Sequence, residues 1–135
     1  MQLNAASLSK LKKVNKDLAN IVMRAAYLAA ANDPGFIVTC GIRDMKEQKR
    51  LVAIGASKTL RSRHLPGAKT GLSHAVDLAA TVGGKVRWDW PLYAKLNSLM
   101  MQAAKELGTP LEWGGDWKTF KDGPHWQLPW DKYPG

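Results

Sequence analysis

The chain has 135 residues, of which 45% are hydrophobic and 23% are charged, and its formal net charge is +9. This composition excludes a disordered or fibrous protein, and the length suits one domain, so we expect residues 1–135 to fold as a single unit. The excess of basic residues favours a polyanionic partner, such as nucleic acid, an anionic membrane surface or an anionic wall polymer.

The first predicted element is one amphipathic helix from Leu8 to about Ala31. Its apolar residues recur at helical spacing, with lysines among the polar positions, as expected for a helix that packs one face on a core. The Asn-Asp-Pro-Gly segment at 32–35 ends this helix, because proline lacks a backbone donor and disfavours helical geometry in the preceding residue.

A buried strand and a short helix follow. Residues 36–39 are sufficiently apolar and β-branched to form a buried strand. Cys40, the only cysteine, ends this run, so we interpret it as a buried, inert thiol, and no intramolecular disulfide can form. Asp44 is a suitable N-cap for a helix through about Ile54, which ends near Gly55.

A long loop and a second strand are predicted in the middle of the chain. Residues 57–73 include a proline and two glycines among polar side chains, which is typical of a loop. Residues 75–79 are predicted to form the strand, and Gly83-Gly84 indicates a turn.

One further helix and two short strands complete the prediction. The helix covers residues 91–107, with proline tolerated in its first turn, and it ends at Gly108. Residues 111–113 and 125–128 are short strands on either side of a loop at 114–124. Few short strands separated by helices predict an α+β fold, with helices packed on a small, largely antiparallel sheet.

Side chains that could hold a metal ion occur in two segments. A catalytic zinc usually takes three ligands from His, Asp, Glu or Cys and leaves one position for water. His64 precedes Asp77 across the long loop, and Asp122 lies three residues before His125. These residue types predict a zinc site, which the sheet would carry.

The identity of the first ligand has two candidates, His64 and His74. Side chains alternate between the two faces of a strand, so His74 and Asp77 point in opposite directions unless the strand is irregular. This alternation favours His64, delivered from the loop. Asp77 itself has another interpretation, as a buried carboxylate paired with an arginine.

Asp122 is the candidate general base. The Gly-Pro turn between Asp122 and His125 could fold the carboxylate back toward a metal ion held by His125. A carboxylate near a zinc ion, but not bound to it, can accept a proton from the zinc-bound water. The alternative is an aspartate that caps a turn beside a surface histidine.

Together these motifs resemble a known family. Ser62-Arg63-His64, followed by Ala75-Val76-Asp77-Leu78, resembles the Ser-x-His…Ala-x-Asp signature of the zinc peptidases. That family includes D-alanyl-D-alanine carboxypeptidases, related dipeptidases and phage L-alanyl-D-glutamate endopeptidases. The segments 112–117 and 122–128 resemble the second half of the phage endolysin version. The twelve residues between His64 and Asp77 form a longer segment than the family pattern has, which keeps His74 open as a substitute.

The resemblance implies roles for further residues. It implies Zn²⁺ held by His64, Asp77 and His125, with Asp122 as the base. Arg43 and Gln48 correspond to substrate-side positions, where the guanidinium could bind a carboxylate or stabilise the oxyanion. The alternative for Arg43 is a structural ion pair with a neighbouring carboxylate.

Ser62 and Trp113 are the remaining candidates near the substrate. Ser62 could orient the loop or hydrogen-bond the substrate. Trp113, together with Trp117 and Trp126, surrounds the second motif and could line a groove for peptide or sugar. The alternative is that these aromatic side chains fill the core.

The implied activity is zinc-dependent hydrolysis of a peptidoglycan stem peptide between L-alanine and D-glutamate, by a phage endolysin that acts on the cell wall. A D-alanyl-D-alanine carboxypeptidase is the second possibility. The N-terminus lacks signal-peptide order, and no run of about 18 apolar residues occurs, so we expect cytoplasmic synthesis without stable membrane insertion. We also expect a monomer, released to the wall by a separate pore-forming protein.

Two non-catalytic functions compete with this interpretation. The charge of +9 and six tryptophans would suit a nucleic-acid-binding protein, although no recognisable binding motif is present, so we expect no nucleic-acid partner. A wall-binding module with a degenerate, metal-free site is the other. Zinc content together with turnover separates the peptidase from both.

Overall fold

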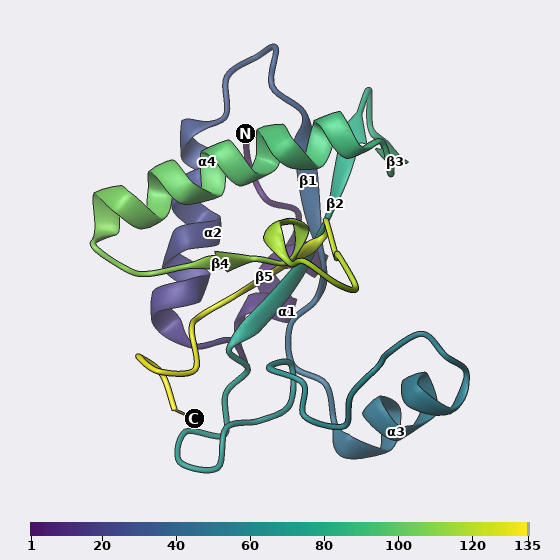
Figure 1. The fold of residues 1–135 in the computed structure, drawn as a ribbon. Helices are drawn as coiled ribbons and strands as arrows, with labels where there is room; N and C mark the ends of the chain where they lie inside the picture. The colour runs from purple at the N-terminus through teal and green to yellow at the C-terminus, as the bar shows by residue number, and fades with distance from the viewer. Residues whose placement is uncertain (135) are drawn as a thin grey trace.

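The computed structural model describes residues 1–134, which form helices packed on a small antiparallel sheet (Figure 1). The strand order is β1-β2-β5-β4, with β3 paired to the end of β2, and every pairing between these strands is antiparallel. The predicted α+β class is therefore confirmed. The strands are β1 (Gly35–Cys40), β2 (Ala75–Val82), β3 (Lys85–Arg87), β4 (Glu112–Trp113) and β5 (His125–Gln127).

The N-terminal segment forms two helices, so the prediction of one helix from Leu8 to Ala31 is wrong. The two are α1 (Ala5–Leu11) and α2 (Lys16–Leu28). The Asn15 side chain caps the start of α2 by accepting a hydrogen bond from the Asp17 amide. The backbone amide of Asn15 donates to Ser73 at 2.7 Å, so a contact with the distant loop interrupts the helical hydrogen bonds.

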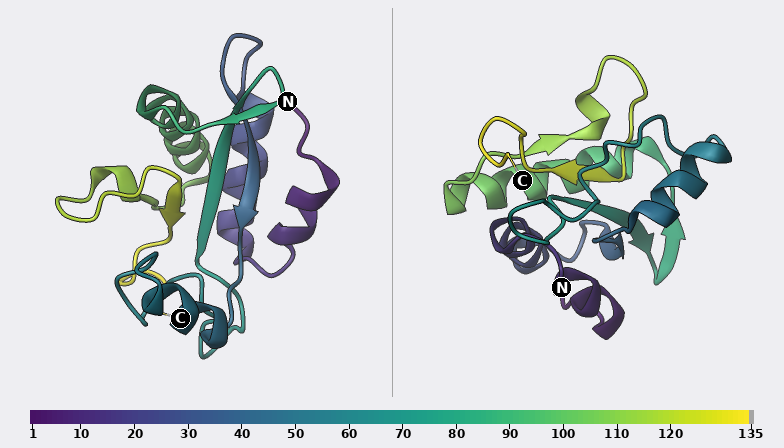
Figure 2. Two further views of the ribbon diagram at one scale, coloured as in Figure 1. Left: turned by 90° about the vertical axis from the view of Figure 1, so that its right-hand side faces the viewer. Right: turned by 90° about the horizontal axis from the view of Figure 1, so that it is seen from below.

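The other two helices agree closely with the sequence prediction. Helix α3 (Met45–Ala53) begins after Asp44, whose side chain accepts from the Glu47 amide. Helix α4 (Trp90–Leu107) carries proline in its first turn and ends at Gly108, whose φ of 68° is left-handed. Figure 2 shows α3 and the loop after it at one end of the sheet, away from α2 and α4.

The hydrophobic core lies between α1, α2, α4 and one face of the sheet. On β2, Val76, Leu78 and Ala80 belong to this core, and Trp126 joins them from β5. Because side chains alternate along a strand, Asp77 and His125 are directed to the opposite face. The core thus leaves one face of β2 and β5 available for a site.

The turn predicted at Gly83-Gly84 is confirmed and joins β2 to β3. Both glycines have positive φ, of 59° and 79°, which two-residue hairpin turns require. The sequence analysis missed β3, because its three residues are all exposed and carry no apolar alternation. Within residues 1–134, no helix combines the length and apolar character that crossing a bilayer requires.

The break between α1 and α2 yields a stability test. We expect Asn15→Ala to lower the free energy of unfolding by about 0.5–2 kcal/mol, because α2 loses its N-cap. Urea denaturation monitored by circular dichroism measures the change. Asn20→Ala, at an exposed position inside α2, serves as the control and should be neutral or stabilising. Stabilisation by both substitutions would indicate an uninterrupted helix.

Candidate active site

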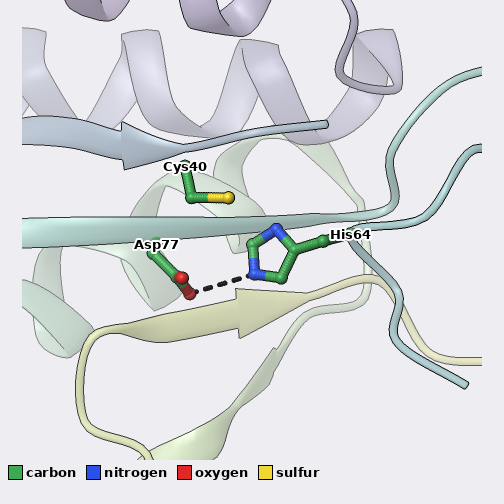
Figure 3. Close-up of side chains that lie close together, drawn as sticks. All are labelled: Cys40, His64 and Asp77. Carbon is green, nitrogen blue, oxygen red and sulfur yellow. Dashed lines mark hydrogen bonds and ion pairs between the residues drawn. The ribbon is translucent and has the colours of Figure 1, made fainter. Parts of the chain in front are cut away.

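The site is organised around one oxygen of Asp77. His64 Nε2 and His125 Nδ1 each lie 3.1 Å from Asp77 Oδ1. The two imidazole rings meet edge to face, with centroids 5.1 Å apart. The structure therefore brings the three predicted metal ligands together, and Figure 3 shows the Asp77 and His64 side chains directed at each other beside Cys40.

Sheet register positions Asp77 and His125. They are direct partners in the antiparallel pairing of β2 with β5, so their side chains leave the same face of the sheet. The next pair along, Val76 and Trp126, points into the core. A register slip of one residue would exchange the two faces, so core packing also fixes the position of the site.

His64 comes from the loop between α3 and β2. The backbone of this residue is held on both sides: its amide donates to Ser62 Oγ at 3.1 Å, and its carbonyl accepts from the Arg43 amide at 2.8 Å. His74 is buried elsewhere, with its ring 6.4 Å from that of Tyr133. The alternation argument that separated His74 from Asp77 agrees with this arrangement.

A β-bulge brings Cys40 to the site. Val38 pairs with Leu78, but Cys40 pairs with Asp77, so Thr39 is an extra residue in β1. Without the bulge, Cys40 would share the core face of Val38. Cys40 is partly exposed, which corrects the expectation of a buried thiol, and Arg43 Nη2 donates to its sulfur at 3.4 Å.

The outer nitrogens of the two histidines are both held by oxygen atoms. His64 Nδ1 lies 2.7 Å from the Gly41 carbonyl, and His125 Nε2 lies 2.8 Å from Gln127 Oε1. The Nε2 group of Gln127 donates in turn to Glu112 at 3.3 Å. This hydrogen bond directs the side-chain carbonyl of Gln127 toward His125. Oxygen acceptors at the outer nitrogens place the ring protons there, so in neutral rings the inner nitrogens present lone pairs to Asp77.

This donor set fits a cation. Two imidazole lone pairs and a carboxylate oxygen repel one another unless protons or a metal ion lie between them. Outer-nitrogen hydrogen bonds of this kind orient histidine ligands in metal sites. Ligand atoms lie within 4.8 Å of one another in two groups that share Asp77: Cys40, His64 and Asp77; and Asp77, Asp122 and His125.

Electrostatics at the site favours positive charge next to Asp77. Burial would lower the pKa of His64, but the Asp77 carboxylate and the Cys40 contact raise it to about 10. Burial would raise the pKa of Asp77, but His64 and His125 lower it strongly. For the Cys40 thiol, His64 and Arg43 outweigh burial, so its pKa is lowered.

Asp122 lies beside the three residues in a tightly held turn. Its amide donates to the Gly114 carbonyl at 3.0 Å, and a side chain at Gly114 would meet the Asp122 carbonyl. Trp113 Nε1 donates to the Gly123 carbonyl at 2.7 Å. Burial, and then the Asp77 charge, raise the pKa of Asp122, which suits a group that exchanges protons.

Arg43 and Gln48 contact each other at the edge of the site. Arg43 Nη1 donates to Gln48 Oε1 at 2.8 Å, and Arg43 Nη2 lies 3.7 Å from Asp77 Oδ2. Gln48 is fully buried, with 0% exposure, and its amide also donates to Ser57 and to the Thr59 carbonyl. The substrate contact expected of Gln48 is therefore not available, and Gln48 holds Arg43 and the following loop instead.

The site opens into a pocket of about 690 Å³. Arg43, Ser62, Asp122 and the three candidate metal ligands line it. Trp113 does not line the pocket, which corrects the groove-lining expectation. It pairs with Trp126 across the strands, and its ring stacks on that of Trp126 and packs against the core. Of the three tryptophans around the second motif, only Trp117 lines the pocket, where its ring lies 5.2 Å from that of His125.

Sequence reasoning missed Arg63 and Trp130. Arg63 is buried and donates to the carbonyl oxygens of Leu128, Pro129 and Tyr133, so it ties the C-terminal segment to the His64 loop. Its guanidinium also lies 4.1 Å from the centre of the Trp130 ring, which lines the pocket. No local sequence signal could have linked residues this far apart.

Comparison with known proteins gives a consistent result. The family model described as phage L-alanyl-D-glutamate peptidase matches residues 1–127. A solved structure, the Serratia marcescens L-Ala D-Glu endopeptidase ChiX, superposes with a TM-score of 0.88 at 40% identity, covering 100% of this chain and 95% of that one.

Curated relatives carry the same description. The L-alanyl-D-glutamate peptidase of Listeria phage A118 is 39% identical over 91% of this chain, and the chain spans 42% of the length of that protein. The Bacillus subtilis (strain 168) peptidoglycan L-alanyl-D-glutamate endopeptidase CwlK is 35% identical over 85% of this chain and 75% of its own length. The L-alanyl-D-glutamate peptidase of Escherichia phage T5 is 29% identical over 84% of this chain and 79% of its own length.

The role of Arg63 can be tested by stability and hydrogen exchange. Arg63→Met removes the donors to the C-terminal segment, so we expect the free energy of unfolding to fall by about 1–3 kcal/mol. The Tyr133 amide, which bonds to Pro129, should exchange faster with solvent. Arg61→Met is the control, because Arg61 stacks on the same ring without donating to that segment. Equal effects of both substitutions would contradict a hydrogen-bonded tie.

Proposed function

The chain belongs to the phage L-alanyl-D-glutamate peptidase family, and from this we propose that it is a metal-dependent peptidase of peptidoglycan stem peptides. The bond between L-alanine and D-glutamate is the proposed cleavage site, as in the names of its relatives. The observation that carries the proposal is the convergence of His64 and His125 on one oxygen of Asp77, within the pocket.

We propose that His64, Asp77 and His125 bind Zn²⁺. Two imidazole nitrogens and one carboxylate are a usual ligand set for catalytic zinc, and Gly41 and Gln127 orient the rings from outside. When bound there, zinc would polarise the scissile carbonyl and acidify water. Cys40 lies near His64 and Asp77 but does not line the pocket, so it has no proposed role in hydrolysis.

Asp122 is the proposed general acid and base. It accepts a proton from the attacking water and later delivers that proton to the amine of the leaving peptide. Its partly buried position beside His125 and its raised pKa support this exchange. Glu112, a carboxylate on the neighbouring strand, does not line the pocket and accepts a hydrogen bond from Gln127 instead.

Arg43 and Ser62 are proposed to contact the substrate. Arg43 lines the pocket next to Asp77, where its guanidinium can stabilise the oxyanion that forms during hydrolysis. Gln48 supports this by holding one side of the guanidinium. Ser62 lines the same pocket and orients His64 through its hydroxyl.

The direct test of the activity is digestion of purified peptidoglycan by the zinc-loaded protein. Mass spectrometry of the products should show stem peptides that begin with D-glutamate, and a chelator should stop their release. Release of terminal D-alanine alone would indicate a carboxypeptidase instead. Binding to the wall without any cleavage would contradict a peptidase function.

The ligand assignment predicts a contrast between two histidines. His64→Ala should lose bound zinc, because it removes one of three ligands. His74→Ala should retain it, because His74 is buried outside the pocket. Atomic absorption on the folded fraction of each preparation measures zinc per chain, with circular dichroism to confirm folding. Zinc retained in the first variant and lost in the second would exchange the two assignments.

Asp122→Asn separates the base from the ligands. The amide is nearly isosteric and no proposed ligand is removed, so zinc content and fold should be unchanged. Cleavage of a stem peptide should fall by about 10²–10⁴-fold, which is the usual contribution of general acid-base catalysis.

Asp77→Asn is the matched control for this measurement. It should weaken zinc binding, because it replaces the anionic ligand. Both variants are assayed for zinc and for rate on the same preparations. A parental cleavage rate in Asp122→Asn would exclude Asp122 as the base.

A further inference from the structure

We propose that Arg61 is a specificity residue that binds a carboxylate of the substrate in the pocket. The inference rests on the proposed peptidase function. It assigns a role to a side chain outside the two motifs and outside the proposed catalytic group.

The first observation is that Arg61 contacts an aromatic ring through the face of its guanidinium, which leaves its N–H donors unused. Its guanidinium stacks on the Trp130 ring at 4.2 Å from the centroid, and Arg63 lies at 4.1 Å from the same ring. Arg63 is buried and anchors the segment that carries Trp130. A stacked guanidinium keeps its in-plane N–H donors free, because stacking uses only the face of the group.

The second observation concerns the charges around it. Arg61 and Trp130 both line the pocket that contains Asp77 and Asp122. Those two carboxylates already lie against the histidines, and Arg43 is the arginine that approaches Asp77. None of the ion pairs formed among residues 1–134 includes Arg61.

The remaining cations strengthen the positive potential on this side. Lys58 and Lys121 line the same pocket, and neither forms an ion pair among the described residues. Lys58 lies 5.6 Å from the centre of the Phe120 ring. A positioned guanidinium with two nearby ammonium groups attracts an anion, and its planar fork matches a carboxylate in particular.

Two carboxylates of a stem peptide are candidates: the free carboxylate of D-glutamate and the C-terminus. The test uses three synthetic peptides: the parent, the parent with the D-glutamate carboxylate as carboxamide, and the parent with the C-terminus as carboxamide. Each is cleaved by the zinc-loaded wild-type protein and by zinc-loaded Arg61→Met. Calorimetry of the same peptides with Asp122→Asn, with and without Arg61→Met, reports binding independently of turnover.

We expect Arg61→Met to raise KM for the parent peptide by on the order of 10- to 100-fold with little change in kcat. For one of the two amidated peptides, the wild-type protein should show the same rise in KM, and Arg61→Met should raise KM no further. That result identifies the carboxylate that Arg61 binds. Arg61→Lys should recover part of the affinity, because it keeps the charge but not the fork. Lys95→Met, an exposed charge on α4 outside the pocket, should leave all constants unchanged.

The role of Arg61 would be overturned if Arg61→Met raised KM equally for all three peptides. It would also be overturned if the wild-type protein bound the parent peptide and both amidated peptides with the same affinity. The proposed function fails by a different result, namely no cleavage of any peptide by the zinc-loaded wild-type protein. In that case the calorimetric comparison still decides whether Arg61 recognises a carboxylate.

Discussion

The antiparallel pairing of Asp77 with His125 is the constraint on which the rest of the site depends. It places a carboxylate and an imidazole side by side on one face of the sheet, and His64 then needs only to reach the same oxygen from a loop. Burial of Val76 and Trp126 on the opposite face holds this register, because a slip of one residue would expose the core. On these two strands, the same register that buries the core residues therefore also sets the geometry of the site.

The groups around this pair orient its side chains and set their protonation. Carbonyl oxygens of Gly41 and Gln127 determine which nitrogen of each histidine faces Asp77. Asp122 approaches from a turn that packs against Gly114, where a glycine is required because a Cβ would meet the Asp122 carbonyl. The result is a proposed cation-binding group next to a carboxylate with a raised pKa, which is the combination that metal-assisted hydrolysis needs.

The pocket wall is assembled from segments that are remote in sequence. Arg63, next to His64 in the loop, donates to carbonyl oxygens of the C-terminal segment, and the guanidinium groups of Arg61 and Arg63 both lie over the Trp130 ring from that segment. The loop that carries a proposed metal ligand is thereby tied to the surface that would receive the substrate. Changes in the C-terminal segment are therefore expected to act on the proposed substrate contact of Arg61 without altering the proposed metal ligands.

The sequence by itself determined the α+β class and most element positions, and it predicted the candidate set His64, Asp77, His125 and Asp122 with His74 left open, because periodicity, capping residues and short motifs are local signals. Only the tertiary structure decided the rest. The helix break at Asn15 depends on a contact with Ser73, the position of Cys40 depends on an extra residue in β1, and Trp113 faces the core because of its partner on β5. The burial of Gln48 beside Arg43 rules out the predicted substrate contact, and it is produced by packing between segments, which no local sequence pattern records.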